Sequence, residues 1–285
     1  MSVKRVNLIT RIKAINANQK ITNAMELIAN VKLKKERAIY DSNQAFAKDI
    51  YQLMYLVLTE HPDKKNHYSL NTNPNSTLFI VVTSNFGLCG AYNENAIEFA
   101  KDKIRKTDKV IVIGHKGINA FEDLGYDVVL KIEDDKSGYE RDEATSIAKL
   151  AISLFDKNVV GSVRFVYTAF INQYTYELTS IPLLPLTLKD SGVDYIPNGI
   201  LLFEPDEDSI LNYLIPLYFE TTIYSHLIES HVSEQSTRRL AMQKATDNAQ
   251  DIKDNLQIEY NKIRQTTITQ EIIEIVSGMK EGIYD

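Results

Sequence analysis

The chain contains two long stretches, residues 1–61 and 217–277, that have neither glycine nor proline. These two residue types interrupt regular structure most often, so their absence predicts uninterrupted elements. Both stretches are rich in alanine, lysine, glutamate, glutamine, leucine and isoleucine, which favour helices. A helix of about 60 residues is roughly 90 Å long at 1.5 Å per residue, longer than an ordinary domain is wide. We therefore expect two long helices that pack on each other, on another chain, or on both.

Each stretch carries a stripe of residues at intervals of three, four or seven, the spacing of a helix face that packs on another helix. The first helix is expected over 3–59, and its stripe consists of Leu8, Ile12, Ile15, Gln19, Thr22, Ala29 and Leu33. The stripe of the last helix consists of Ala245, Ala249, Ile252, Leu256, Tyr260 and Ile263. The matching intervals predict that Leu8, Ile12 and Ile15 face the region of Leu256, Tyr260 and Ile263.

Between the two stretches, short apolar runs alternate with helical patterns. This alternation predicts a small α/β domain with a mainly parallel sheet. Strands are expected at 77–83, 109–114, 127–132, 163–170 and 175–181, and helices at 94–106, 116–124 and 142–157. A proline-containing connection at 181–205 follows, and the last helix is expected to start with Pro205 in its first turn and to kink at Pro216. The domain boundaries predicted from these patterns are 1–60, 76–190 and 206–285.

Charge is unevenly distributed along the chain. Residues 1–50 carry ten Lys/Arg and four Asp/Glu, a net +6, so a total of −6 leaves −12 for the remainder. A basic helix on an acidic body suits nucleic acid, an anionic membrane surface or an acidic protein, and equally a helix face that simply meets solvent. The sequence contains no run of about 18 apolar residues, so no membrane span is predicted, and it shows no secretory signal. The single cysteine, Cys89, allows no disulfide within the chain and fits a reducing compartment.

No part of the sequence carries a strong motif for catalysis or for binding a cofactor or metal. Gly87-x-x-Gly90 follows a strand but matches neither the dinucleotide nor the P-loop spacing, so tight-turn glycines are the better interpretation. The segment 114–117 also opens a helix and could hold an anion, although a connecting loop explains it as well. Cys89 fits a buried small residue better than a nucleophile. The histidines and the acidic run 133–135 match no metal-site spacing, so we expect no catalytic, cofactor or metal site.

Both ends of the chain carry long, correctly ordered sequence segments of one family. The segments are RIKAI at 11–15, QKITNAM at 19–25, RRLAM at 238–242, ATDNA at 245–249, YNKIRQ at 260–265 and ITQEIIEIVSG at 268–278. In these segments the chain closely resembles the gamma subunit of F-type ATP synthases. Gly87, Leu88, Cys89 and Gly90, with Tyr92 and Asn93, resemble the middle signature of that family. The resemblance covers the whole chain and is weakest between 100 and 200.

The resemblance implies a central rotor shaft that is not itself catalytic. The two terminal helices would form an antiparallel coiled coil inside a hexamer of alpha and beta subunits, with the α/β domain at its foot. The complex would couple rotation to ATP synthesis or hydrolysis and to proton transport, with the epsilon subunit and the c-ring as further partners. It would lie at the cytoplasmic face of the cell membrane, without inserting into it. The family's contacts with the hexamer correspond here to Lys20, Met25, Arg238, Gln265, Thr269, Glu271 and Glu274, and its central turn corresponds to Gly87, Cys89 and Gly90.

The chain departs from the family pattern at two places. Asn85 and Phe86 stand where the family usually has Asp and then Arg or Gln, and Met279 stands where it usually has Ala. These departures leave one alternative open: a gamma-like shaft of a paralogous F-type ATPase head, which hydrolyses ATP for other mechanical work without a proton path.

Two other functions have less support in the sequence. The basic helix lacks the aromatic residues among its basic ones that nucleic-acid binding would favour. The α/β region lacks the paired acid and base, or the phosphate loop, that an enzyme would need.

Overall fold

The computed structural model describes residues 3–60, 68, 73, 76–133, 138–186, 204 and 206–281. Most of the predicted loop at 61–75, the connection beyond 186, Pro205, the acidic pair Asp134 and Asp135, and the tail after 281 lie outside the described residues. Contacts divide the chain into two compact units. Unit 1 comprises Met1–Ile28 and Arg239–Asp285, and unit 2 comprises Ala29–Arg238.

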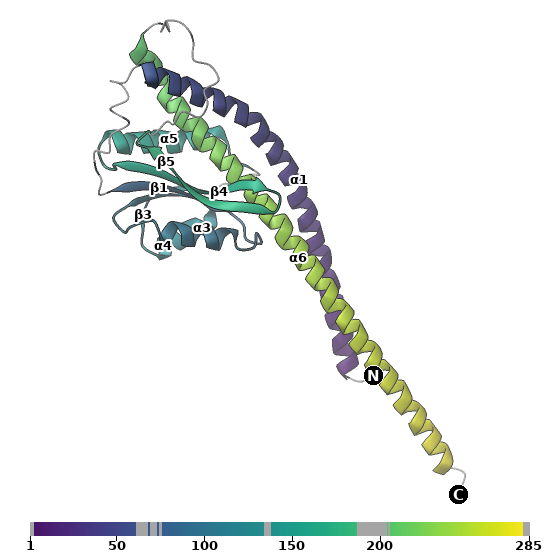
Figure 1. Cartoon of the computed structure of the whole chain (residues 1–285). Coiled ribbons are helices and arrows are strands. Elements are labelled where there is room, and N and C mark those ends of the chain that lie inside the picture. The colour runs from purple at the N-terminus through teal and green to yellow at the C-terminus, as the bar shows by residue number, and fades with distance from the viewer. Residues whose placement is uncertain are drawn as a thin grey trace. The chain divides into compact units, whose positions relative to one another are not determined.

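Two long helices, α1 (Val3–Glu60) and α6 (Glu207–Glu281), run through both units, which confirms the central expectation (Figure 1). The start of α6 differs in detail from the prediction. The backbone N–H of Ser209 donates to Asp206 Oδ1 at 2.9 Å, so Asp206 caps a helix that begins at Glu207. The prediction that Pro205 lies in the first turn concerns a residue outside the described ones. Pro216 lies inside α6, and the kink expected there stays a prediction.

The centre of unit 2 is a five-stranded sheet in the order β3-β2-β1-β4-β5. Four strands are parallel, and β5 runs antiparallel to β4 at the edge, as the mainly parallel prediction requires. The strands are β1 (Thr77–Val82), β2 (Lys109–Ile113), β3 (Asp127–Ile132), β4 (Ser162–Asn172) and β5 (Thr175–Leu184). The intervening helices are α3 (Tyr92–Lys101), α4 (His115–Asp123) and α5 (Arg141–Asp156).

Strand β1 separates two apolar clusters because successive side chains of a strand point to opposite faces. Phe79 and Val81 pack with α3 and α4 on one face. Leu78, Ile80 and Val82 join the larger cluster on the other face, to which α5 and the unit 2 parts of α1 and α6 contribute. Figure 1 shows α3 and α4 together on one side of the sheet. The unit 2 part of α6 is thus part of the domain core.

Two elements, β5 and α3, differ most from the bounds that the sequence predicts. Strand β5 continues through Pro182 to Leu184, although proline was expected to end it at 181. Pro182 pairs with Arg164 of β4, and an edge strand tolerates proline because its outer N–H groups need no partner. Helix α3 begins at Tyr92 and ends at Lys101 instead of spanning 94–106. The Tyr92 side chain is fully buried and bonds Ser230, so tertiary packing fixes this start.

Unit 1 consists of α1 and α6 packed antiparallel. Thr22 Oγ1 and Thr246 Oγ1 are 2.8 Å apart, Gln19 donates to Gln250 Oε1 at 3.0 Å, and Arg5 Nη2 donates to Tyr260 Oη at 3.1 Å. From one of these contacts to the next, the residue number on α6 rises while the number on α1 falls, as antiparallel helices require. The predicted antiparallel pairing is confirmed at the polar seam members Gln19 and Thr22, which bond to polar partners on α6.

Two apolar members of the seam, Leu8 on α1 and Leu256 on α6, are buried. Ile12 and Tyr260 line the same shallow cavity of about 230 Å³. The prediction for Ile252 is wrong, because this side chain is 45% exposed. Lys253 takes the seam position instead and donates to Gln19 Oε1 at 3.2 Å. A lysine can occupy such a position because its aliphatic stem packs while its ammonium finds a polar partner.

Candidate functional site

The turn that follows β1 is held by hydrogen bonds within it. Gly90 has φ 61° and Leu88 has φ 63°, a conformation that glycine adopts freely and leucine rarely. Asn93 Oδ1 accepts the backbone N–H of Ser84 at 2.8 Å, and Ser84 Oγ donates to the Phe86 carbonyl at 2.6 Å. The interpretation of the glycines as turn residues therefore holds at Gly90. The interpretation of Cys89 as a buried small residue is confirmed, since it is 1% exposed.

Arg238 ties this turn to α6. Its Nη1 atom donates to Glu234 Oε1 at 2.6 Å, and its Nη2 atom donates to the carbonyl oxygens of Phe86 and Gly87 at 3.2 and 3.5 Å. The Arg238 side chain is only 15% exposed. The planar guanidinium can hold a carboxylate and two carbonyls at once, whereas a lysine ammonium offers only a point charge. Phe86 and Leu88 remain 66% and 60% exposed at this turn.

Removing the Arg238 tether should make Cys89 accessible. Burial raises the pKa of the Cys89 thiol, so the wild-type thiol should react slowly with alkylating reagents. In Arg238→Ala the turn loses two hydrogen bonds from a charged donor, those to the carbonyl oxygens of Phe86 and Gly87. We expect alkylation to accelerate roughly tenfold, since such a bond contributes about 1.5–3 kcal/mol. Iodoacetamide labelling of this single cysteine measures the rate, with exposed Arg11→Ala as the control. Equal rates in the two variants would show that the tether does not hold the turn.

The amino terminus of α4 is closed by the chain's own acceptors. The backbone N–H groups of His115, Lys116 and Gly117 donate to Asn85 Oδ1, the Ser84 carbonyl and Thr83 Oγ1 at 3.0, 3.2 and 2.9 Å. A Cβ atom at Gly117 would lie 2.6 Å from Thr83 Oγ1, so glycine permits this close approach. Because a bound anion needs these same N–H groups, the segment 114–117 acts as a structural junction, in line with the connecting-loop interpretation.

A buried polar network joins α1, α6 and the segment before α5 within unit 2. His231 Nδ1 lies 3.5 Å from Glu36 Oε2, and the side chains are 10% and 5% exposed. The Tyr139 ring meets the His231 ring edge-on at 5.7 Å between centroids. Gln235 Nε2 lies 3.1 Å from His231 Nε2. Burial lowers the pKa of His231, but Glu36 and Glu234 raise it by more, so the net shift is upward.

The raised pKa makes the His231 contribution to stability dependent on pH. The folded-state pKa lies above the unfolded value of about 6.5, so the contribution is complete below that value and is lost as pH rises through the folded pKa. We expect wild-type stability to decline over this range relative to His231→Gln. Urea unfolding at a series of pH values tests this, with exposed His115→Gln as the control. Parallel pH profiles for wild type and His231→Gln would contradict it.

The residues predicted to contact partners lie in different places. Lys20, Met25, Gln265, Thr269, Glu271 and Glu274 are exposed on the unit 1 helices, and Met25 is 37% exposed. Arg238 belongs to unit 2 and points inward to Glu234 and Gly87. The structure thus brings Arg238 together with the predicted central turn. Partner contact by any of these residues remains a prediction.

The contact between Glu36 and His231 was not predicted, because the two residues are far apart in the chain and neither belongs to a local motif. The buried polar run in the middle of α6, from Glu229 to Thr237, was not predicted either. Acidic, serine and glutamine residues in a helix usually indicate a solvent-exposed face, so no sequence signal predicted that this polar face is buried.

Among the described helices, none is long and apolar enough to cross a membrane.

Comparison with known proteins gives consistent matches over nearly the full length. The family model described as ATP synthase matches residues 6–280. The ATP synthase gamma chain of Mycoplasma mobile is 35% identical over 97% of this chain and 98% of its own length. The chain from the central stalk and c-ring structure of Tetrahymena thermophila mitochondrial ATP synthase is 25% identical, with a TM-score of 0.61 over 79% of this chain and 99% of that one. A chain of the Euglena gracilis mitochondrial ATP synthase, 16% identical, shares the fold with a TM-score of 0.67 over 97% of this chain and 94% of its own.

Proposed function

Because this chain belongs to the ATP synthase gamma-chain family, we propose that it is the central rotor shaft of an F-type ATP synthase or ATPase. In this role it couples rotation to ATP synthesis or hydrolysis in a hexamer of alpha and beta subunits and to proton transport. The antiparallel helix pair of unit 1 is the observation that carries the proposal. Met25 and Gln265, which lie outside its seam, are exposed and available to surrounding subunits.

The mechanism follows from differential contact. A shaft that presents a different face to each beta subunit favours a different open or closed state in each one. Rotation then changes the nucleotide affinity of each site in turn, because binding at the site and contact with the shaft are coupled. The polar bonds of the seam, such as Gln19 with Gln250, support this role because they fix the register of the two helices. Lys20, Met25, Arg238, Gln265, Thr269, Glu271 and Glu274 are the proposed contacts.

The proposed assembly also includes the epsilon subunit and a c-ring, at the cytoplasmic face of the cell membrane. The match to a chain of a central stalk and c-ring structure supports these partners. The assembly is tested by affinity purification of the tagged full chain from its native source. Alpha, beta, epsilon and c subunits should copurify. Recovery of alpha and beta homologues without epsilon and c would favour the paralogous head without a proton path.

We expect the isolated chain to hydrolyse no ATP, because nucleotide turnover belongs to the hexamer in the proposed role. The closed amino terminus of α4 supports this, since its N–H groups are bonded to Asn85, Ser84 and Thr83 and cannot cradle a phosphate. A phosphate-release assay on the purified chain measures turnover, and the reconstituted complex is the positive control. Turnover by the chain alone that a substitution within it abolishes would overturn the non-catalytic assignment.

A further inference from the structure

The contact between Gln235 and His231 on α6 joins two nitrogen atoms. Gln235 Nε2 lies 3.1 Å from His231 Nε2 and 3.4 Å from Glu234 Oε1, and both the amide and the ring are buried. An amide nitrogen donates hydrogen bonds and accepts none. The contact with the ring is therefore a hydrogen bond only where His231 Nε2 carries no proton. This arrangement fits the neutral imidazole with its proton on Nδ1.

The surroundings of the ring favour a charged imidazole. Burial and Arg238 lower the pKa of His231, whereas Glu36 and Glu234 raise it by more. From the segment before α5 the ring meets the Tyr139 ring edge-on. Glu36 Oε2 lies 3.5 Å from Nδ1, so a proton on Nδ1 faces a carboxylate in both charge states of the ring. The proton that is gained and lost is then the one on Nε2, which faces Gln235.

Proton uptake at Nε2 conflicts with this orientation of the Gln235 amide. Two N–H donors would face each other across 3.1 Å. The Oε1 atom of the same amide is buried and has no hydrogen-bond partner among the described residues. The two ends of an amide are similar in size, so rotation by half a turn exchanges them and brings Oε1 to the protonated Nε2. The amide nitrogen then takes the place where Oε1 had no partner, so neither orientation bonds both ends of the amide and the proton decides between them.

We propose that His231 and Gln235 form a proton-controlled lock between α1 and α6 within unit 2. When Nε2 carries no proton, the ring accepts the Gln235 N–H and offers Glu36 only a neutral N–H. When Nε2 is protonated, Gln235 Oε1 accepts that proton, and the imidazolium holds the Glu36 carboxylate of α1 in a charge-assisted hydrogen bond. Such bonds are shorter than neutral ones and about twice as strong.

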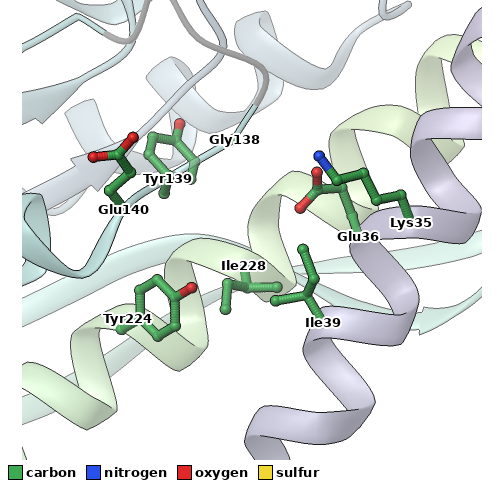
Figure 2. Close-up of a pocket in the computed structure, with 8 residues that line it drawn as sticks. All are labelled: Lys35, Glu36, Ile39, Gly138, Tyr139, Glu140, Tyr224 and Ile228. Carbon is green, nitrogen blue, oxygen red and sulfur yellow. The ribbon is translucent and has the colours of Figure 1, made fainter.

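The position of Glu36 allows this bond to tighten. Glu36 and Tyr139 line a cavity of about 300 Å³ in unit 2 (Figure 2). The carboxylate is therefore not packed on every side, although the residue is only 4% exposed. It can move from 3.5 Å toward Nδ1 when the ring becomes charged. The lock involves no other subunit, so it stands apart from the proposed rotor role.

Solution NMR of the full chain, with nitrogen-isotope labels in histidine and glutamine, tests the lock in the unaltered protein. We expect the neutral His231 ring to carry its proton on Nδ1. The side-chain amide signal of Gln235 should shift with the same midpoint as the His231 ring, whereas that of exposed Gln257 should not. A neutral ring protonated on Nε2, or a Gln235 amide that does not follow the His231 titration, would overturn the proposal.

Gln235→Met separates the lock from a purely structural contact. Methionine has a similar length, but its thioether donates no hydrogen bond and accepts one only weakly. If Gln235 stabilises the imidazolium, as proposed, its loss lowers the pKa of His231 relative to wild type. If Gln235 only donates to the neutral ring, the same change raises that pKa and the proposal fails. Gln257→Met is the surface control and should leave the pKa unchanged.

A double-mutant cycle of Glu36→Gln and His231→Gln measures the bond between the two helices. The interaction between these residues, from urea unfolding, should be about twofold larger below the His231 midpoint than above it. Circular dichroism confirms that each variant is folded. An interaction of equal size at the two pH values would show that protonation does not tighten the contact. If the Glu36 variants fold poorly, the titration of the Gln235 amide in the wild-type chain decides alone.

Discussion

A Met25→Lys rotor is expected to assemble into its complex and to turn over ATP about three- to tenfold more slowly. Met25 is 37% exposed on the unit 1 part of α1 and lies outside the seam, so lysine fits without repacking the helix pair. The resemblance to the gamma subunit implies that this position meets a lever segment of a beta subunit, and these segments are acidic in the family. A new ion pair that breaks in each cycle adds to the rotational barrier. An exposed pair contributes about 0–1 kcal/mol and a partly desolvated one more, and each 1.4 kcal/mol is about tenfold in rate.

The experiment compares Met25→Lys with Met25→Leu, which changes the side chain without adding charge. Single-molecule rotation rate, ATP hydrolysis and proton pumping are measured on both assembled complexes. High salt should partly restore the lysine variant, because it screens an exposed ion pair. If the lysine variant matches the leucine variant, or fails to assemble, the proposed contact at Met25 is wrong.

Replacing Phe219 by alanine should destabilise unit 2 by about 3–5 kcal/mol, the usual range for removing a buried phenylalanine. Phe219 is 0% exposed and belongs to the larger apolar cluster, where the unit 2 part of α6 packs with the strands and α5. Urea unfolding followed by circular dichroism measures the change in the free energy of unfolding.

Tyr213→Ala is the matched control for Phe219→Ala. It also removes an aromatic ring from α6, but Tyr213 is 73% exposed, so we expect a change within about 0.5 kcal/mol. A similar small change for Phe219→Ala would mean that the packing of α6 against the sheet contributes little to the stability of the domain.

Periodicity predicted the fold well where local pattern determines structure. The long helices, five strands and the seam through Gln19 and Thr22 follow from intervals of residue type along one segment. Errors arose where contact with a distant part of the chain determines the structure at a position. Pro182 remains within β5 because it lies at a sheet edge, and Ile252 is exposed because Lys253 has a polar partner on α1. Neither fact is present in the residues adjacent to the position.

The candidate site was predictable only in part, for the same reason. The turn at Gly87–Gly90 was identified from its glycines, but its tether to Arg238 depends on how α6 packs. The resemblance suggested Arg238 as a partner contact, whereas its recorded bonds are internal. Glu36 and His231 meet only because α1 and α6 are antiparallel neighbours in unit 2. A single sequence does not show which distant segments of the chain pack against each other.

The pairing of the two ends of the chain sets the order of events during synthesis. Leu33 of α1 packs with Ile228 and Val232 of α6, so these contacts cannot form until α6 has been made. Leu33 and Ile228 are 195 residues apart (228 − 33), and translation at about 5–20 residues per second spans that distance in roughly 10–40 s. During this interval an apolar helix face is exposed on the nascent chain. The sheet, whose strands lie between the two helices in the sequence, is therefore synthesised before the two ends of the chain can pair.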